Sequence, residues 1–154
     1  MAGIKYQCQF YSNNGSRYRI NLYHVDYAGN TIDFKAGTEG FQLKYTSLNN
    51  EVYSTIKASS VQFDFFVEEA PTTIGDPTTG NIWADLVANN ESKLFIIIQQ
   101  YDDDNTAWRN FWAGDIIDDT VTIADAPYPQ QIRIKATDGN RNRRVKLVAD
   151  IIFF

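Results

Sequence analysis

Apolar and polar side chains alternate one by one along much of this chain, which is the pattern of strands with one buried face. The alternation gives five sets of side chains that are predicted to point inward: Tyr6, Cys8 and Phe10; Tyr18, Ile20 and Leu22; Phe41, Leu43 and Tyr45; Val61, Phe63, Phe65 and Val67; and Ile132, Ile134 and Ala136. Residues 92–101 are apolar on both faces and predict a central strand, with a return strand from Thr106 to about Ile117.

Polar turns separate these strands. Asn13-Asn14-Gly15 supplies residues that tolerate a positive φ, and Asp102-Asp103-Asp104-Asn105 forms a second polar tip. Both turns predict hairpins, so neighbouring strands are expected to run antiparallel.

One segment has a helical period. Its apolar side chains fall on a single stripe, at Ile82, Trp83, Leu86 and Val87. The sequence therefore predicts a mainly β domain over residues 1–139, an antiparallel β-sandwich or partly closed barrel, with one short α-helix at about residues 80–90.

Composition supports this prediction. The chain has 154 residues, the size of one ordinary domain, and its 10 Phe, 9 Tyr and 3 Trp favour strands. The net charge of −5 makes the domain as a whole a poor counterion for nucleic acid or an anionic membrane. The single cysteine, Cys8, excludes an internal disulfide and fits a reducing compartment. No secretion signal and no run of 18 apolar residues is visible, so we expect no membrane partner.

Charge is spread unevenly. The acidic block between residues 102 and 125 includes Asp102, Asp103, Asp104, Asp118 and Asp119, which we interpret first as solvated turns. Residues 140–154 form a basic and apolar tail, predicted to belong to the same domain or to dock on a neighbour. The tail residues expected to dock are Arg141, Arg143, Arg144, Phe153 and Phe154.

Few residues in the sequence are suited to catalysis or metal binding. His24 is the only imidazole, so a triad or a zinc site lacks partners. The run from Asp102 to Thr106 has neither the Gly nor the distant Glu of a calcium loop. Glu68 and Glu69 are neighbours, which places them on opposite faces of a strand. We therefore expect no enzyme, no cofactor and no metal site.

The aromatic residues are better candidates for function. Trp108 and Trp112 are four positions apart, so an unbroken strand would place them on one face with Asn110 between them. With Tyr101, they are candidates for anchoring a protein interface or for stacking on sugar rings. The alternative, that these rings fill the core, stays open.

Two motifs in the second half form a familiar order. They are Phe111-Trp112-Ala113-Gly114-Asp115-Ile116-Ile117 and, after a polar stretch, Pro129-Gln130-Gln131-Ile132-Arg133-Ile134-Lys135-Ala136-Thr137-Asp138-Gly139. This order resembles tail proteins of tailed bacteriophages, and most of all the β domain of baseplate hub and distal-tail proteins. The tail after Gly139 departs from that pattern, which usually continues into a leucine-containing segment and further domains.

The resemblance implies a structural protein of the virion tail, assembled in the cytoplasm of the bacterial host. Its partners would be copies of itself in a ring around the tail axis, and other tail proteins. A channel lined by the Asp residues of the acidic block would let DNA pass without sticking. The alternative from another class is a carbohydrate-binding or adhesive β-sandwich that uses Trp108 and Trp112.

Overall fold

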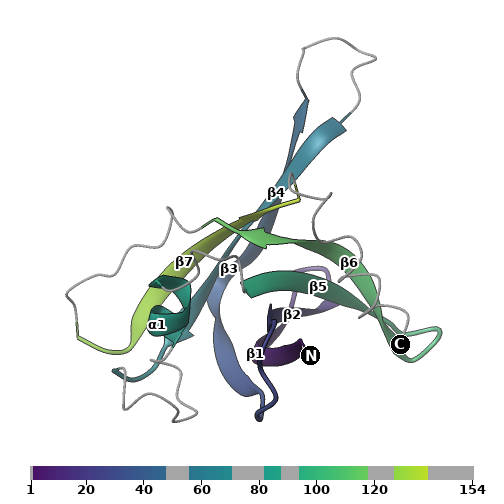
Figure 1. Ribbon diagram of the computed structural model, residues 1–154. Coiled ribbons are helices and arrows are strands. Elements are labelled where there is room, and N and C mark those ends of the chain that lie inside the picture. Colours follow the sequence, from purple (N-terminus) through teal and green to yellow (C-terminus); the bar gives the residue numbers. More distant parts are fainter. Residues whose placement is uncertain (1, 48–55, 71–81, 88–93, 118–126, 139–154) are drawn as a thin grey trace.

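The computed structural model describes residues 2–47, 56–70, 82–87, 94–117 and 127–138. Within these ranges the elements follow the order shown in Figure 1: β1 (Gly3–Tyr11), β2 (Arg17–His24), β3 (Ile32–Ser47), β4 (Ile56–Val67), α1 (Ile82–Val87), β5 (Leu94–Asp102), β6 (Ala107–Ile116) and β7 (Gln130–Thr137). The prediction of a mainly β fold is confirmed, and α1 lies inside the range predicted to be helical.

The strands form a closed barrel in the order β1-β2-β5-β6-β7-β4-β3. Six of the seven neighbouring pairs are antiparallel, as the hairpin turns predicted. The seventh pair, β1 with β3, is parallel and joins Tyr6 to Ile32 and Cys8 to Phe34. Of the predicted alternatives, a sandwich or a partly closed barrel, the sandwich is not confirmed, and the described strands close fully because β3 returns beside β1 and completes the circle.

Two of the seams in this barrel are short. The parallel seam between β1 and β3 has three residue pairs, and the seam between β6 and β7 has two, Asp115 with Thr137 and Ile116 with Ala136. Pairing along the other strands is much longer. Consequently, beyond Phe34 no other described strand pairs with the second edge of β3.

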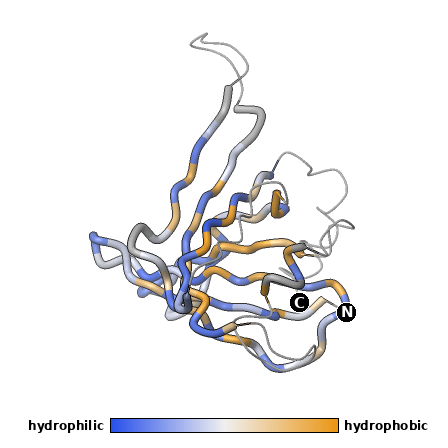
Figure 2. Tube along the Cα trace, turned by 90° about the vertical axis from the view of Figure 1, so that its left-hand side faces the viewer, coloured by the Kyte–Doolittle hydropathy of each residue, from blue (hydrophilic) through white to orange (hydrophobic). Residues whose placement is uncertain are grey.

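Large apolar side chains fill the barrel. Figure 2 shows hydrophobic and hydrophilic residues alternating along the strands, as a half-buried sheet requires. The larger side chains that are completely buried inside include Tyr6, Ile20, Leu22, Phe63, Phe65, Ile96, Ile98 and Ile134. The interior is thus a packed core and not a passage.

The helix α1 is attached to the barrel by apolar and polar contacts. Ile82 and Leu86 enter the core, as the helical stripe predicted. Asp85 accepts a hydrogen bond from the Tyr6 hydroxyl (2.7 Å) and pairs with Lys5 (2.6 Å). Burial, and then the nearby carboxylate of Asp85, raise the pKa of Tyr6 above its ordinary value. These contacts fix the helix beside the start of β1.

Side chains reinforce the short seam between β6 and β7. The Trp112 indole N–H donates to Ser59 Oγ on β4 (2.8 Å), and the Ser59 hydroxyl donates to Asp138 at the end of β7 (2.6 Å). Gly114 leaves room for this arrangement, because a Cβ there would lie 2.4 Å from the Trp112 ring and 2.6 Å from the Thr137 carbonyl oxygen. This network links β6 to β4 and β7, and it supports the seam where β6 and β7 share only two residue pairs.

A buried carboxylate joins β4 to β7. Asp64 is 4% exposed and accepts two hydrogen bonds from Arg133 (2.8 Å each) and one from Gln131 (3.0 Å). The hydrogen bonds from Arg133 hold the pKa of Asp64 below its ordinary value.

We predict that Asp64→Asn lowers the free energy of unfolding at pH 7 by about 1–3 kcal/mol, because charged hydrogen bonds are lost. Since the folded pKa is depressed, the stabilisation by Asp64 is fully present above the unfolded pKa of about 3.9 and is lost as the pH falls through the folded pKa. Urea unfolding should therefore show the gap between wild type and variant closing toward pH 2. Asp103→Asn, the same change at an exposed position, is the control, and an equal loss in both variants would contradict the prediction.

Candidate functional site

Polar and aromatic side chains lie on the outside of β1, β2, β5 and β6, beside a second apolar cluster formed by Tyr23, Phe95 and Ile97. This surface arises because alternate residues of these strands fill the core, so that the residues between them point outward. We call the following nine residues the outer face: Gln7, Gln9, Arg17, Arg19, Asn21, Gln99, Tyr101, Trp108 and Asn110.

Side-chain amides form one row of hydrogen bonds across the outer face. Gln9 donates to Gln7 (3.1 Å), and Gln7 donates to Asn21 (2.8 Å). Asn21 donates to Gln99 (3.0 Å), and Gln99 donates to Asn110 (2.8 Å). The first bond runs along β1, and the other three all run from β1 toward β6. The row fixes five amides in a rigid arrangement over four strands.

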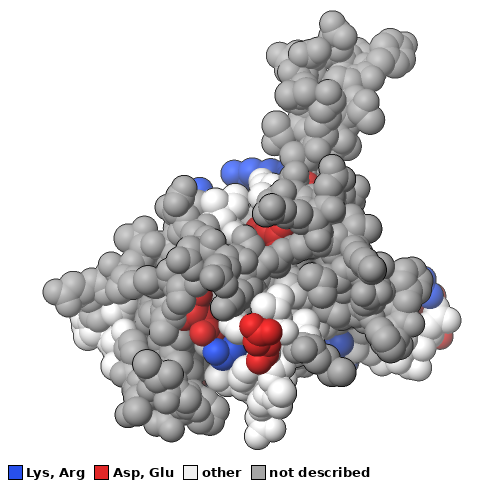
Figure 3. Space-filling model, viewed as in Figure 1, with Lys and Arg blue, Asp and Glu red and all other residues white. Residues whose placement is uncertain are grey.

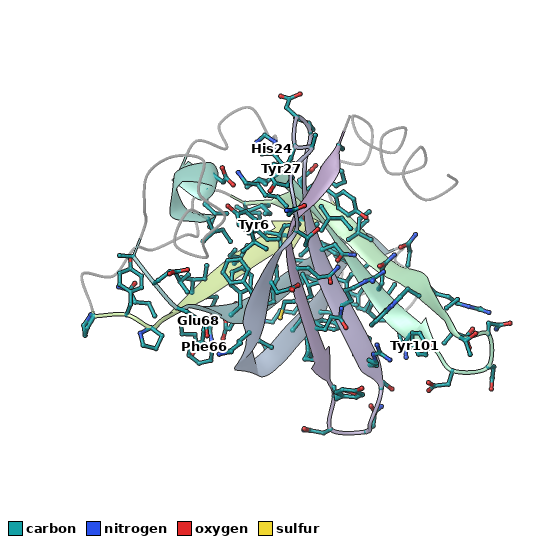
Figure 4. All side chains as sticks on the ribbon, turned by 90° about the horizontal axis from the view of Figure 1, so that it is seen from below. Tyr6, His24, Tyr27, Phe66, Glu68 and Tyr101 are labelled. Atoms are coloured by element: carbon teal, nitrogen blue, oxygen red, sulfur yellow. The ribbon has the colours of Figure 1, made fainter. Side chains whose placement is uncertain are left out.

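Two arginines lie against two aromatic rings beside this row. Tyr101 and Trp108 pair across β5 and β6, with ring centroids 5.2 Å apart in an edge-to-face arrangement. The Arg17 guanidinium lies 4.7 Å from the Tyr101 centroid and 5.1 Å from that of Trp108, and the Arg19 guanidinium lies 4.3 Å from Trp108. Arg19 also donates two hydrogen bonds to Gln99 Oε1 (3.0 and 2.6 Å), which ties the arginines to the amide row. Figure 4 shows Tyr101 toward the β5–β6 hairpin and away from α1.

The prediction that Trp108 and Trp112 share a face is wrong. Ile98 pairs with Trp112 and Gln99 pairs with Asn110, so Phe111 is an extra residue that forms a β-bulge. The bulge reverses the alternation, which places Trp108 on the outer face and Trp112 in the core, where it is 9% exposed. Trp112 is therefore unsuited to stacking on a sugar or a partner protein.

The acidic hairpin tip is where the sequence predicted it. Asp102 accepts hydrogen bonds from the Asn105 side chain (2.8 Å) and the Asp104 N–H (3.0 Å), and it pairs with Arg109 (2.5 Å). The bond from Asn105 is the main cause that lowers the pKa of Asp102. Asp103 and Asp104 are exposed, and with Tyr101 they border a shallow pocket of about 360 Å³.

The other predicted site residues lie outside the described residues: Asp118, Asp119, Arg141, Arg143, Arg144, Phe153 and Phe154. On the face seen in Figure 3, acidic and basic side chains of the described residues lie beside one another. The surface described there is therefore mixed in sign.

A second surface, which the sequence did not indicate, lies where β1 and β3 separate. It is an aromatic groove of about 520 Å³ whose lining includes Phe10, Tyr11, Tyr18, Gly40 and Phe41. The Phe10, Tyr18 and Phe41 rings contact one another at 5.2–5.9 Å. Gly40 has a positive φ of 60°, and a Cβ there would approach the Phe10 ring to 3.0 Å. We call this feature the aromatic groove.

Three large apolar residues are exposed near the aromatic groove and along β3. Tyr11 is 71% exposed, Tyr45 is 63% exposed and Phe111 is 43% exposed. Tyr45 was predicted to point inward, which is wrong, because β4 pairs with β7 only as far as Ser60 and so β7 does not reach Tyr45. An exposed tyrosine on an alternating strand cannot be told from a buried one by sequence pattern alone.

The remaining candidates, Cys8 and His24, have surroundings that indicate a role in the fold. Cys8 is buried, as predicted, and burial raises the pKa of its thiol to about 12. His24 Nδ1 accepts a hydrogen bond from the Asp26 N–H (3.2 Å). Among the residues that the structure describes, no three His, Cys, Asp or Glu side chains converge as metal ligands would. None of the described helices has the length and hydrophobicity needed to cross a membrane.

Comparison with protein-family models, with curated proteins and with solved structures gave no match to this chain. The functional argument therefore depends on the surfaces described above.

We predict that replacing the two tryptophans lowers the free energy of unfolding by different amounts. Trp112→Ala should cost about 3–5 kcal/mol of unfolding free energy, because it empties part of the core. Trp108→Ala should cost about 1 kcal/mol, the size of the cation–π contacts that it removes. Urea unfolding followed by circular dichroism measures both losses. Similar losses in the two variants would contradict the assignment of the two residues to opposite faces.

Proposed function

We propose that this chain is a non-enzymatic structural component of a bacteriophage tail or baseplate, which acts by assembling with copies of itself and with other tail proteins. The observation that carries the proposal is the open edge of β3, with exposed aromatic residues beside it. The resemblance in residues 111–139 supplies the biological setting.

The open edge of β3 favours association. From Lys35 to Ser47, β3 pairs with β4 and with no other described strand. In Figure 1 the far ends of β3 and β4 extend away from the barrel as a two-stranded ribbon. Such a ribbon is marginally stable by itself, and an unpaired strand edge is a template for another strand. A neighbouring subunit would satisfy both conditions.

The exposed aromatic residues favour the same surface. Tyr45 lies on β3 itself, and Tyr11 lines the aromatic groove at the same seam. Tyrosine is enriched among the residues that contribute most to protein interfaces, because its large ring is buried while its hydroxyl keeps a polar partner. Contact between subunits would remove these rings from water.

A second open edge favours a ring over a simple pair. Residues 107–114 of β6 pair with β5, and no described strand pairs with their other side. A subunit with two different open edges can join head to tail, and a head-to-tail interface closes into a ring when the rotation per subunit permits it. In the proposed ring, DNA passes through the central opening that the subunits surround. It does not pass through a barrel, because the interior of each barrel is filled with side chains.

The carbohydrate-binding alternative has one specific observation in its favour. Planar amides and aromatic rings, which the outer face combines, are groups that contact sugars in many binding sites. Against it, guanidinium groups already lie over the Tyr101 and Trp108 rings, and Trp112 is buried. The assembly proposal therefore comes first, and a glycan array with the purified chain tests the alternative.

The assembly proposal predicts that the purified chain forms oligomers that weaken when Tyr45 is replaced. Tyr45→Lys should raise the dissociation constant about tenfold or more, as expected for an interface anchor. Asn30→Lys introduces the same charge at another exposed position and should have little effect. Size exclusion with light scattering measures the masses, and negative-stain microscopy shows whether rings form. A chain that stays monomeric both alone and with proteins encoded by neighbouring genes would overturn the proposal.

The channel hypothesis predicts a separate effect on DNA passage. Replacing the exposed pair Asp103 and Asp104 with Asn removes negative charge that would repel phosphates. Phage that carry the double variant should eject DNA more slowly while assembling normal tails. Ejection followed by a fluorescent DNA dye measures the rate, and unchanged kinetics would rule out an acidic lining by these residues.

A further inference from the structure

We propose that the outer face binds an extended polypeptide segment of low net charge, with an Asp or Glu side chain of that segment held by Arg17 and Arg19. Trp108 and Asn110 of this site lie on β6 beside the second open edge, whereas Arg17 and Arg19 lie on β2, so the proposal concerns binding by a single subunit.

Both guanidinium groups lie against Trp108, and no anion among the described residues pairs with them. Nearby Arg109, by contrast, pairs with Asp102. A guanidinium over a ring keeps its N–H donors around its edge, where they can meet a carboxylate. Arg19 already donates to Gln99 Oε1 through Nε and Nη2, which leaves its Nη1 and the guanidinium of Arg17 for the carboxylate.

Electrostatics also favours an anion here. Partial burial lowers the pKa of Arg19; Tyr23 acts against this shift, and the charge of Arg17 acts with it. Two cations that contact the same Trp108 ring on a partly buried surface carry a free-energy cost. A carboxylate bound between them offsets that cost by direct attraction and by hydrogen bonds.

The amide row indicates the shape of the partner. The row adjoins Arg19 through Gln99, and it crosses four strands from Gln9 to Asn110. Three strand spacings amount to roughly 14 Å, which is about four residues of extended chain. Asn21 in the middle of the row is buried, so the amides that can meet the peptide groups of such a segment are the accessible ones, Gln7, Gln9, Gln99 and Asn110.

Charge and the occupied rings disfavour the main competing ligands. Long polyanions such as nucleic acid are disfavoured, because the chain carries a net charge of −5 and the exposed Asp103 and Asp104 lie next to Tyr101. Neutral sugars would have to stack on rings that the guanidinium groups already contact. A single carboxylate on an uncharged or lightly charged peptide meets neither obstacle.

The test measures fluorescence anisotropy of a labelled eight-residue Gly/Ser peptide that carries two Glu residues. Arg17→Gln and Arg109→Gln form a matched pair, because each removes one positive charge near Tyr101. They differ in that Arg17 lies over the Trp108 ring, whereas Arg109 pairs with Asp102. We expect Arg17→Gln to weaken binding at least fivefold and Arg109→Gln to weaken it less than twofold. With the wild-type chain, a peptide with Gln in place of Glu should bind at least fivefold more weakly, which tests the site even if a variant fails to fold.

Several results would overturn the proposal. Equal weakening by the two variants would reduce the effect to long-range attraction, and equal binding of the Glu and Gln peptides would remove the role of the carboxylate. Absence of binding at millimolar peptide, or tighter binding of a neutral oligosaccharide or of single-stranded DNA, would assign the outer face to another partner or to none.

Discussion

Three residue pairs between the parallel strands β1 and β3 hold the first and third strands of the chain together and close the barrel. The core makes so short a seam sufficient, because side chains from every strand meet in one cluster that the helix extends through Ile82 and Leu86. Burial of apolar surface is worth about 25 cal/mol for each Å² removed from water. Summed over the core, this free energy is far larger than the contribution of a few edge hydrogen bonds. The packed interior thus favours the closure, and beyond Phe34 the second edge of β3 has no partner strand among the described residues.

The two candidate surfaces follow from that arrangement and differ in chemistry. The aromatic groove lies where β1 and β3 separate, and its rings and the exposed Tyr45 offer apolar area to a second subunit. The outer face lies over four neighbouring strands, and its side chains are amides in hydrogen bonds, arginines and the two rings that the arginines contact. One surface favours association by burial, and the other favours recognition of a specific charged group. A chain that bound both its own copies and a different partner, as proposed, would use each.

Local pattern predicted the strands well, because period-two alternation depends only on neighbouring residues. It identified the core positions Tyr6, Phe63 and Ile134 and the inward side of α1. It failed where long-range pairing decides, as at the bulge of Phe111, whose extra residue depends on how β6 pairs with β5. Closure of the barrel, the exposure of Tyr45 and the stacking of Arg17 on Tyr101 likewise require strands that lie far apart in the sequence.

The amide row has a built-in polarity. Arg19 donates to Gln99 Oε1, so the oxygen of that amide must face Arg19, and the N–H group must face Asn110. Reversal of any one amide within the row would set two oxygens or two N–H groups against each other, whereas the exposed end residues Gln9 and Asn110 can turn to water instead. The guanidinium of Arg19 on β2 therefore determines the direction in which the amide dipoles of the row point. A ligand that displaced Arg19 from Gln99 would change the hydrogen bonding of amides as far away as Gln9 on β1.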